Sequence, residues 1–262
     1  MTEQLNIAYI QPNIEWHNIE KNLKKYDSCI NKIEGADIIA LPEMFATGFT
    51  NEINGLAQTM NGQIVGWIKQ KAIEKKALII GSQLITHNNK TYNRLLAAFP
   101  DGELKTYDKH HLFRMGLEND TITAGNEILI FNYKGWNIRP IVCYDLRFPV
   151  WLRNTNNAYD LLICVTNWPT SRVLSYNVLL QARAIENQCY VVGVNRIGTD
   201  GLNIEYPGNS CIINPYGEII DILPSNVEGY GQSYISLDML KTHREKFPAF
   251  LDADQFTINN KQ

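Results

Sequence analysis

The chain of 262 residues has no long hydrophobic run, no excess of positive charge and no closely spaced pair of cysteines. No apolar stretch approaches the roughly 18 residues of a membrane span, so we expect no membrane partner. The net charge of −3 lacks the basic excess that is typical of nucleic-acid-binding domains, so no nucleic-acid partner is predicted either. The first residues, Met1–Asn6, lack the basic and apolar regions of a signal peptide.

Cysteine and histidine are also scarce. The five cysteines form no CxxC pair, so we expect reduced thiols in a cytoplasmic protein. The five histidines show no ligand spacing with these cysteines, and a metal site is not predicted. The chain also has no glycine-rich phosphate loop.

Short apolar segments alternate with amphipathic ones along the chain, which predicts interleaved strands and helices. The predicted strands are 5–10, 36–41, 77–85, 91–99, 103–107, 128–133, 136–142, 161–165, 189–194, 210–213, 218–223 and 231–237. The predicted helices are 18–33, 64–76 and 173–187, the last with Leu174, Val178 and Ile185 on one apolar stripe. The tail from about residue 238 begins with a helical pattern and then loses it.

Three turn signals join neighbouring strands and predict antiparallel hairpins. They are Pro100-Asp101-Gly102, Lys134-Gly135 and Asn214-Pro215-Tyr216-Gly217. Strand–helix–strand units elsewhere predict parallel strands covered by helices. Because no Pro-, Gly- or Ser-rich linker divides the chain, we expect one α/β domain with mixed sheets over residues 1–262.

A reactive side chain follows three of the predicted strands at the point where each strand ends. Glu43 comes after 36–41, Lys109 after 103–107 and Cys143 after 136–142. Ligands of α/β sheets bind at the carboxyl ends of strands, so these three side chains can converge.

Each of the three has a chemical role that fits the others. A buried glutamate with a raised pKa can act as a general base. A lysine can stabilise an oxyanion or lower the pKa of a thiol, and a thiolate is a nucleophile. Taken singly, however, each also fits a structural role: a loop carboxylate, a solvated surface lysine and an inert core thiol.

Other roles for Cys143 stay open from the residues alone. His110 or His111 could form a Cys–His dyad, although no cysteine-protease signature surrounds them. A redox thiol would need a resolving partner, for which Cys164 is the candidate.

The segments around Glu43, Lys109 and Cys143, in this order, resemble the nitrilase superfamily of carbon–nitrogen hydrolases. The likeness extends from Ile7 to about Phe256. It includes Pro12-Asn13, Glu43-Met44-Phe45-Ala46-Thr47-Gly48-Phe49, Thr91-Tyr92-Asn93, Ala182-Arg183-Ala184-Ile185-Glu186-Asn187, Gly193-Val194-Asn195-Arg196 and Asn214-Pro215-Tyr216-Gly217. The resemblance implies a catalytic Glu43–Lys109–Cys143 triad, with Glu118 as the second glutamate of the family. It implies no cofactor.

The residues after the nucleophile narrow the resemblance to one branch. True nitrilases carry Cys-Trp-Glu, whereas this chain has Cys143-Tyr144-Asp145-Leu146-Arg147-Phe148-Pro149. Together with 166–169 and 244–254, this segment is similar to bacterial omega-amidases. That branch implies a thioester intermediate and substrates that are side-chain amides of 2-oxo dicarboxylic acids. It also implies a four-layer αββα sandwich that pairs into homodimers or higher oligomers, with the tail from about residue 238 in the contact.

Further residues take roles that this substrate class requires. The backbone N–H of Tyr144 is the candidate oxyanion donor, and Arg147 and Arg172 are candidates for binding a carboxylate. Phe45, Phe113 and Trp168 are candidates for an apolar wall. Two other possibilities remain: a hydrolase of N-carbamoyl compounds or another small linear amide within the superfamily, and a non-catalytic binding protein that keeps the fold.

Overall fold

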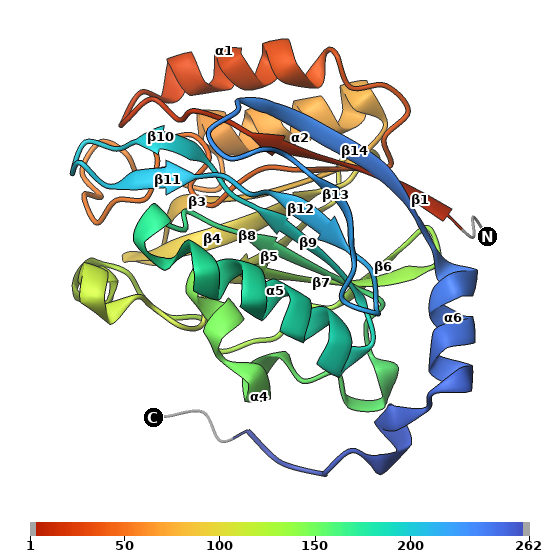
Figure 1. Ribbon diagram of the computed structural model, residues 1–262. Coiled ribbons are helices and arrows are strands. Elements are labelled where there is room, and N and C mark those ends of the chain that lie inside the picture. The colour runs from red at the N-terminus through yellow and green to blue at the C-terminus, as the bar shows by residue number, and fades with distance from the viewer. Residues whose placement is uncertain (1–3, 259–262) are drawn as a thin grey trace.

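Strand β1 (Gln4–Gln11) shows how the layers of this protein arise, because its side chains are buried on both faces. Leu5, Ile7 and Tyr9 pack into an apolar cluster shared by two sheets, whereas Ala8 and Ile10 pack against helices. The structure, a computed structural model, describes residues 4–258. Two six-stranded mixed sheets lie face to face, with α1 and α2 above them and α5 below in the view of Figure 1.

The first sheet has the strand order β14-β1-β2-β3-β4-β5. β1 is parallel to β2, β2 is parallel to β3, and the other neighbours are antiparallel. Helices α1 (Ile19–Ile30) and α2 (Gln63–Lys75) cover its outer face. Its remaining strands are β2 (Ile38–Ala40), β3 (Leu78–His87), β4 (Lys90–Ala98), β5 (Leu104–Asp108) and β14 (Gly229–Ser236).

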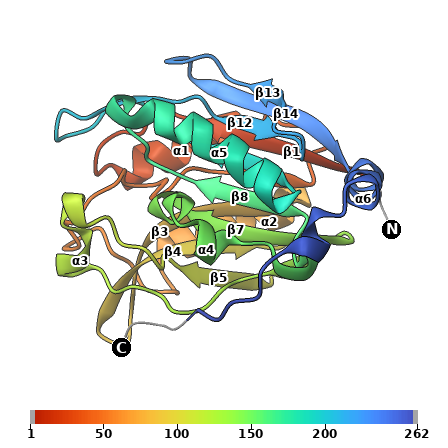
Figure 2. The same cartoon turned by 60° about the horizontal axis from the view of Figure 1, so that its bottom comes forward.

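The second sheet has the order β13-β12-β9-β8-β7-β6. Here β7, β8 and β9 are parallel and the other neighbours are antiparallel. Helix α5 (Val173–Asn187) lies across its outer face (Figure 2). The strands are β6 (Phe131–Tyr133), β7 (Trp136–Val142), β8 (Leu161–Val165), β9 (Tyr190–Val194), β12 (Cys211–Ile213) and β13 (Ile219–Ile222).

Shorter elements connect the two layers. Strands β10 (Ile197–Thr199) and β11 (Glu205–Pro207) form a separate two-stranded antiparallel sheet. The remaining helices are η1 (Arg114–Gly116), α3 (Glu118–Thr121), η2 (Cys143–Arg147), α4 (Pro149–Leu152), η3 (Thr155–Asn157), η4 (Thr170–Arg172), α6 (Leu237–Lys246) and η5 (Ala249–Asp252). Within residues 4–258, no helix has both the length and the apolar character of a membrane span.

The four-layer αββα sandwich and the three hairpins predicted from turn signals are present in the structure. The largest boundary errors are in α1, which ends at Ile30, and in β6, which begins only at Phe131. A fourth hairpin, between β3 and β4, was not predicted. Its turn residues Asn88 and Asn89 both have positive φ, which is the geometry of a type I′ turn.

The apolar stripe predicted on α5 is real but faces solvent. Leu174, Val178 and Ile185 are 75%, 54% and 53% exposed. The face that packs on the sheet carries Tyr176 and Leu180 instead. After α6 the chain passes α4, and residues 249–256 line a cavity together with that helix.

Candidate active site

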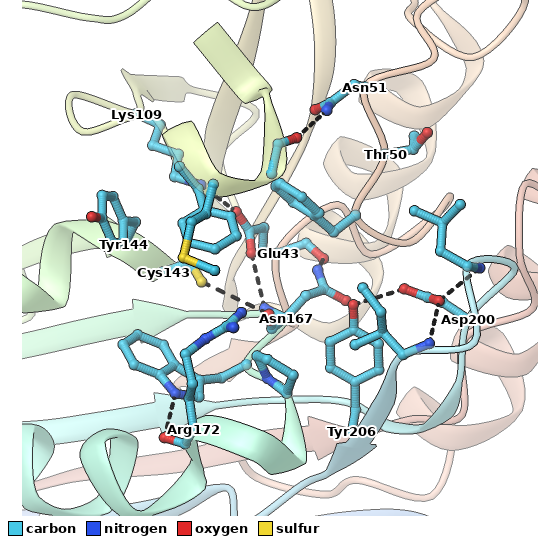
Figure 3. Close-up of a pocket in the computed structure, with 18 of the residues that line it drawn as sticks. Glu43, Thr50, Asn51, Lys109, Cys143, Tyr144, Asn167, Arg172, Asp200 and Tyr206 are labelled. Carbon is cyan, nitrogen blue, oxygen red and sulfur yellow. Dashed lines mark hydrogen bonds and ion pairs between the residues drawn. The ribbon is translucent and has the colours of Figure 1, made fainter.

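Three strand ends place Glu43, Lys109 and Cys143 around one cavity. Glu43 follows β2, Lys109 directly follows β5, and Cys143 directly follows β7 as the first residue of η2. All three side chains line a cavity of about 260 Å³, as Figure 3 shows. The convergence at strand ends that the sequence predicts is therefore present in the structure.

Lys109 lies between two buried carboxylates. Its Nζ is 2.8 Å from Oε1 of Glu43 and 3.0 and 2.9 Å from the two carboxylate oxygens of Glu118. The Lys109 side chain is 1% exposed and both glutamates are fully buried. A buried ion pair of this kind is stable only where further hydrogen bonds satisfy the charged atoms.

One asparagine side chain and two backbone N–H groups supply these hydrogen bonds. Nδ2 of Asn93 donates to Glu43 at 2.8 Å and to Glu118 at 3.2 Å. The backbone N–H of Asn167 donates to Oε2 of Glu43, and the N–H of Phe113 donates to Glu118. Both carboxylates are thus fixed by donors from several different segments of the chain.

The charges of the cluster determine the protonation of Lys109 and Glu118. Burial lowers the pKa of Lys109, but the charges of Glu118 and Glu43 outweigh it, and the pKa is raised overall. Burial raises the pKa of Glu118, and the charge of Lys109 opposes this rise without cancelling it. Lys109 is therefore a permanent cation in the site.

Cys143 sits on a tight turn that exposes its thiol to the cavity. Its φ of 44° is in the left-handed region that L residues rarely adopt. Its Sγ lies 4.0 Å from the carbonyl oxygen of Asn167. Burial and the charge of Glu43 raise the pKa of the Cys143 thiol, and the charge of Lys109 opposes them. The resting thiol therefore keeps its proton near neutral pH, so nucleophilic attack requires a base.

The cavity wall combines apolar and cationic side chains. Tyr144, Phe113 and Trp168 all line it, as do Arg147 and Arg172. The guanidinium of Arg147 lies 4.9 Å from the Trp168 ring centroid and that of Arg172 lies 5.1 Å from the Phe113 ring centroid. In Figure 3, the Arg172 side chain extends from the start of α5 toward Cys143 and Asn167.

Phe45 does not contribute to this wall, so that prediction was wrong. Its side chain is fully buried and packs against Tyr26 of α1 and Trp67 of α2, on the outer face of the first sheet. The chain turns sharply after Glu43, where Met44 has a φ of 43°. The phenyl ring is thereby directed into the core rather than the cavity.

The competing roles for Cys143 find no support in the geometry. The His110 ring stacks on Trp151 and the His111 ring on Phe148, and neither histidine lines the cavity. Cys164 is fully buried within β8, and all five cysteines are free thiols.

Several residues of the site were not predicted as site residues. Asn93 comes from the interior of β4 and Asn167 from the loop after β8. Others line the cavity far from any predicted strand end: Phe49, Thr50, Asn51, Met115, Asp200, Leu202, Ile204 and Tyr206. A sequence signal existed for Asn93, Asn167 and Phe49, because all three belong to segments of the family resemblance.

Comparison with known proteins places this arrangement in a family. The family model described as carbon-nitrogen hydrolase matches residues 6–245. This chain belongs to that family. It is a hydrolase that acts on carbon–nitrogen bonds.

Relatives of this carbon–nitrogen hydrolase align over almost its whole length. Omega-amidase YafV of Escherichia coli strain K12 is 44% identical over 256 residues, which are 97% of this chain and 98% of the relative. The 2-oxoglutaramate amidase of Bacillus subtilis strain 168 is 33% identical over 94% of this chain and 96% of its own.

Solved structures confirm the predicted fold. XC1258 of Xanthomonas campestris, a CN-hydrolase superfamily protein with an arsenic adduct in its active site, has a TM-score of 0.95 and 40% identity, covering 98% of this chain and 99% of its own. Nit3 of Saccharomyces cerevisiae, a member of the nitrilase superfamily, shares the fold with a TM-score of 0.84 at 19% identity, over 95% of this chain and 96% of its own.

Replacing the buried cation tests the electrostatics of the carbon–nitrogen hydrolase site. We expect Lys109→Met to lower the free energy of unfolding by about 3–5 kcal/mol at pH 8, because two buried carboxylates lose their counter-ion. Without Lys109 the raised pKa of Glu118 rises further, so the folded variant binds protons more readily than the unfolded chain. The difference in unfolding free energy between the wild type and Lys109→Met therefore becomes smaller as the pH falls toward 5.

Urea unfolding at pH 5 and pH 8 measures this effect. Lys24→Met, at an exposed lysine, is the matched control and should change stability by no more than about 0.5 kcal/mol. A Lys109→Met deficit that is the same at both pH values would contradict the assignment.

Proposed function

We propose that this protein is an omega-amidase, which releases ammonia from the side-chain amide of 2-oxo dicarboxylic acid monoamides. The observation that carries the proposal is the buried Glu43–Lys109–Glu118 cluster beside the Cys143 thiol in one small cavity. The names of the relatives at 44% and 33% identity support the substrate class. The free state of all five cysteines supports a cytoplasmic location.

In the first half of the proposed reaction, Glu43 accepts the thiol proton of Cys143. The thiolate attacks the amide carbon, and the oxyanion that forms is stabilised by the Lys109 ammonium and the backbone N–H of Tyr144. Donors of this kind contribute roughly 3 kcal/mol each. Glu43 then protonates the amide nitrogen, the C–N bond breaks, and ammonia leaves a thioester on Cys143.

In the second half, a water molecule occupies the place of the departed ammonia. Glu43 accepts one proton from this water as its oxygen attacks the thioester carbonyl carbon. The tetrahedral intermediate collapses, the C–S bond breaks, and the acid product leaves. Glu43 returns the proton to the sulfur, which restores the resting enzyme.

Glu118 has a separate role in this scheme. It holds Lys109 through two oxygens and is itself fixed by the N–H of Phe113. Burial raises its pKa, yet its contacts with Lys109 and two N–H donors all favour a carboxylate. We assign Glu118 to positioning Lys109, and Glu43 to proton transfer.

The carboxylate of the substrate requires a cation in the cavity. Neither Arg147 nor Arg172 forms an ion pair with a carboxylate among residues 4–258. The guanidinium of Arg147 donates a hydrogen bond to Oγ of Ser175. Within residues 4–258, the guanidinium of Arg172 forms no hydrogen bond. Arg172 is therefore the better candidate for bidentate binding of the substrate carboxylate.

Substitution of the nucleophile tests the proposed triad. We expect Cys143→Ala to abolish ammonia release while the fold stays within about 2 kcal/mol of wild-type stability, because the alanine leaves no unpaired buried group. Ammonia release from 2-oxoglutaramate measures activity, and mass spectrometry of a slowly hydrolysed substrate detects the thioester on Cys143. Full activity of the variant would overturn the triad.

Substitution of Arg172 tests the substrate class. We expect Arg172→Leu to lower kcat/KM for 2-oxoglutaramate about 10–100-fold, which is the effect of losing hydrogen bonds to a charged group. Hydrolysis of an aliphatic amide without a carboxylate should be unchanged. Arg114→Leu, at an exposed arginine that lines a different cavity, is the matched control.

A panel of amides separates this proposal from its alternatives. If Arg172→Leu lowered kcat/KM equally for 2-oxoglutaramate and for the aliphatic amide, Arg172 would not be the residue that binds the substrate carboxylate. Preference for N-carbamoyl amino acids over 2-oxo acid amides would assign the enzyme to another branch of the superfamily.

We further propose that the protein forms homodimers through α5. The support is the exposed stripe of Leu174, Val178 and Ile185, whose last member lies beside Gly217 in the turn that leads into the edge strand β13. An exposed apolar face of this kind is typical of a protein interface.

We expect Val178→Arg to convert dimers into monomers in light scattering after gel filtration, whereas Ile73→Arg on α2 does not. A wild-type monomer at high concentration would contradict the proposal.

A further inference from the structure

Asp145 is a fully buried carboxylate that no step of the proposed reaction uses. It lies on η2, two residues after Cys143. Its Oδ1 accepts hydrogen bonds from the backbone N–H of His111 at 2.9 Å and from Nδ1 of His111 at 2.8 Å. Its Oδ2 accepts from the hydroxyl of Tyr107 at 2.8 Å and from the N–H of Val142 at 3.2 Å. The four donors fill the acceptor capacity of a carboxylate.

These four bonds connect the two segments that carry the nucleophile and the cation. Val142 immediately precedes Cys143. Tyr107 and His111 flank Lys109, two residues before it and two residues after it. One side chain therefore ties both sides of the lysine to the turn that holds the thiol.

The donors have little freedom to rearrange. The Tyr107 hydroxyl already accepts from the N–H of His110 and from Nε1 of Trp151, each at 3.3 Å, so its own proton is directed to Asp145. The His111 ring stacks on Phe148, directly after η2, with ring centroids 3.5 Å apart. Backbone N–H groups cannot act as acceptors at all. The environment thus specifies an acceptor at both oxygens of residue 145.

From this geometry we infer that Asp145 is a positioning residue that sets the distance between the Lys109 ammonium and the Cys143 sulfur. The inference rests on the proposed roles of Lys109 and Cys143. A buried carboxylate suits this task because charge-assisted hydrogen bonds are short and strong. It also holds the Val142 N–H beside the positive φ of Cys143, at the point where the turn is strained.

The variant Asp145→Asn tests this role with almost no change in size. An amide offers one oxygen and one NH2 group, so either orientation places the NH2 against a backbone N–H: that of Val142 or that of His111. We expect kcat to fall about 100-fold, which is the scale for misplacing reacting groups by about 1 Å. KM should change far less, because the substrate contacts are not altered.

Alkylation of Cys143 by iodoacetamide provides a readout that does not depend on amidase activity. The charged groups that act on this thiol are Glu43, which raises its pKa, and Lys109, which lowers it; Cys164 also raises it. If Lys109 moves away from the sulfur, the thiol loses its stabilising charge, and the alkylation rate rises only at higher pH than in the wild type.

His111 allows a second test in case Asp145→Asn fails to fold. In histidine and asparagine alike, the δ nitrogen is bonded to Cγ, so His111→Asn can restore the donor to Asp145. His111→Leu cannot. We expect the leucine variant to lose kcat and to shift the alkylation profile, and the asparagine variant to recover most of both.

Asp160→Asn is the matched control for loss of a buried carboxylate. Asp160 is 7% exposed, pairs with Arg244 and does not line the cavity. It should lose stability but keep the wild-type kcat and alkylation profile. The inference is overturned if folded Asp145→Asn behaves like Asp160→Asn, or if His111→Leu and His111→Asn are equally impaired. A Cys143→Ala enzyme that retains activity would overturn the proposed function instead, so the two failures are distinguishable.

Discussion

The charge of Lys109 between two buried glutamates is the constraint on which the rest of this site depends. Two carboxylates this close would repel each other without the cation between them. Burial strengthens every one of these interactions, but it also removes the water that would otherwise satisfy the charged oxygens. The protein replaces that water with donors from Asn93, Asn167 and Phe113. Donors from β4, from the loop after β8 and from the segment before η1 thus all bind the two carboxylates that pair with this one ammonium group.

The two sheets share one order of strand pairings, and one matching pair of strand ends meets in the site. Read from β14 and from β6, both sheets show the same succession: one antiparallel, two parallel and then two antiparallel pairings. In this correspondence β2 matches β8. Glu43 follows β2 and Asn167 follows β8, and the N–H of Asn167 donates to Glu43. Glu43 is thus held by the residue at the matching position of the opposite sheet.

The sequence predicted what depends on local pattern and missed what depends on tertiary geometry. Buried strands followed by polar residues located Glu43, Lys109 and Cys143, because a strand end fixes both the position and the direction of a side chain. Asn93 could not be located in this way, since it points into the site from the middle of β4. Phe45 lies only two residues from Glu43, but the positive φ of Met44 reverses the direction of the chain between them. On α5 the periodicity revealed an apolar face, but the pattern alone does not distinguish a face that packs on a sheet from one that is exposed.

The pairing of β1 with β14 determines when the molecule can be completed during synthesis. The two strands join through eight residue pairs, from Gln4↔Ser236 to Gln11↔Gly229, so the beginning of the chain pairs with a segment close to its end. A nascent chain on the ribosome therefore carries one edge of β1 unpaired until residues 229–236 have emerged. An unpaired apolar strand edge is a template for aggregation. That edge of β1 is therefore open to pairing with other chains until residues 229–236 reach it.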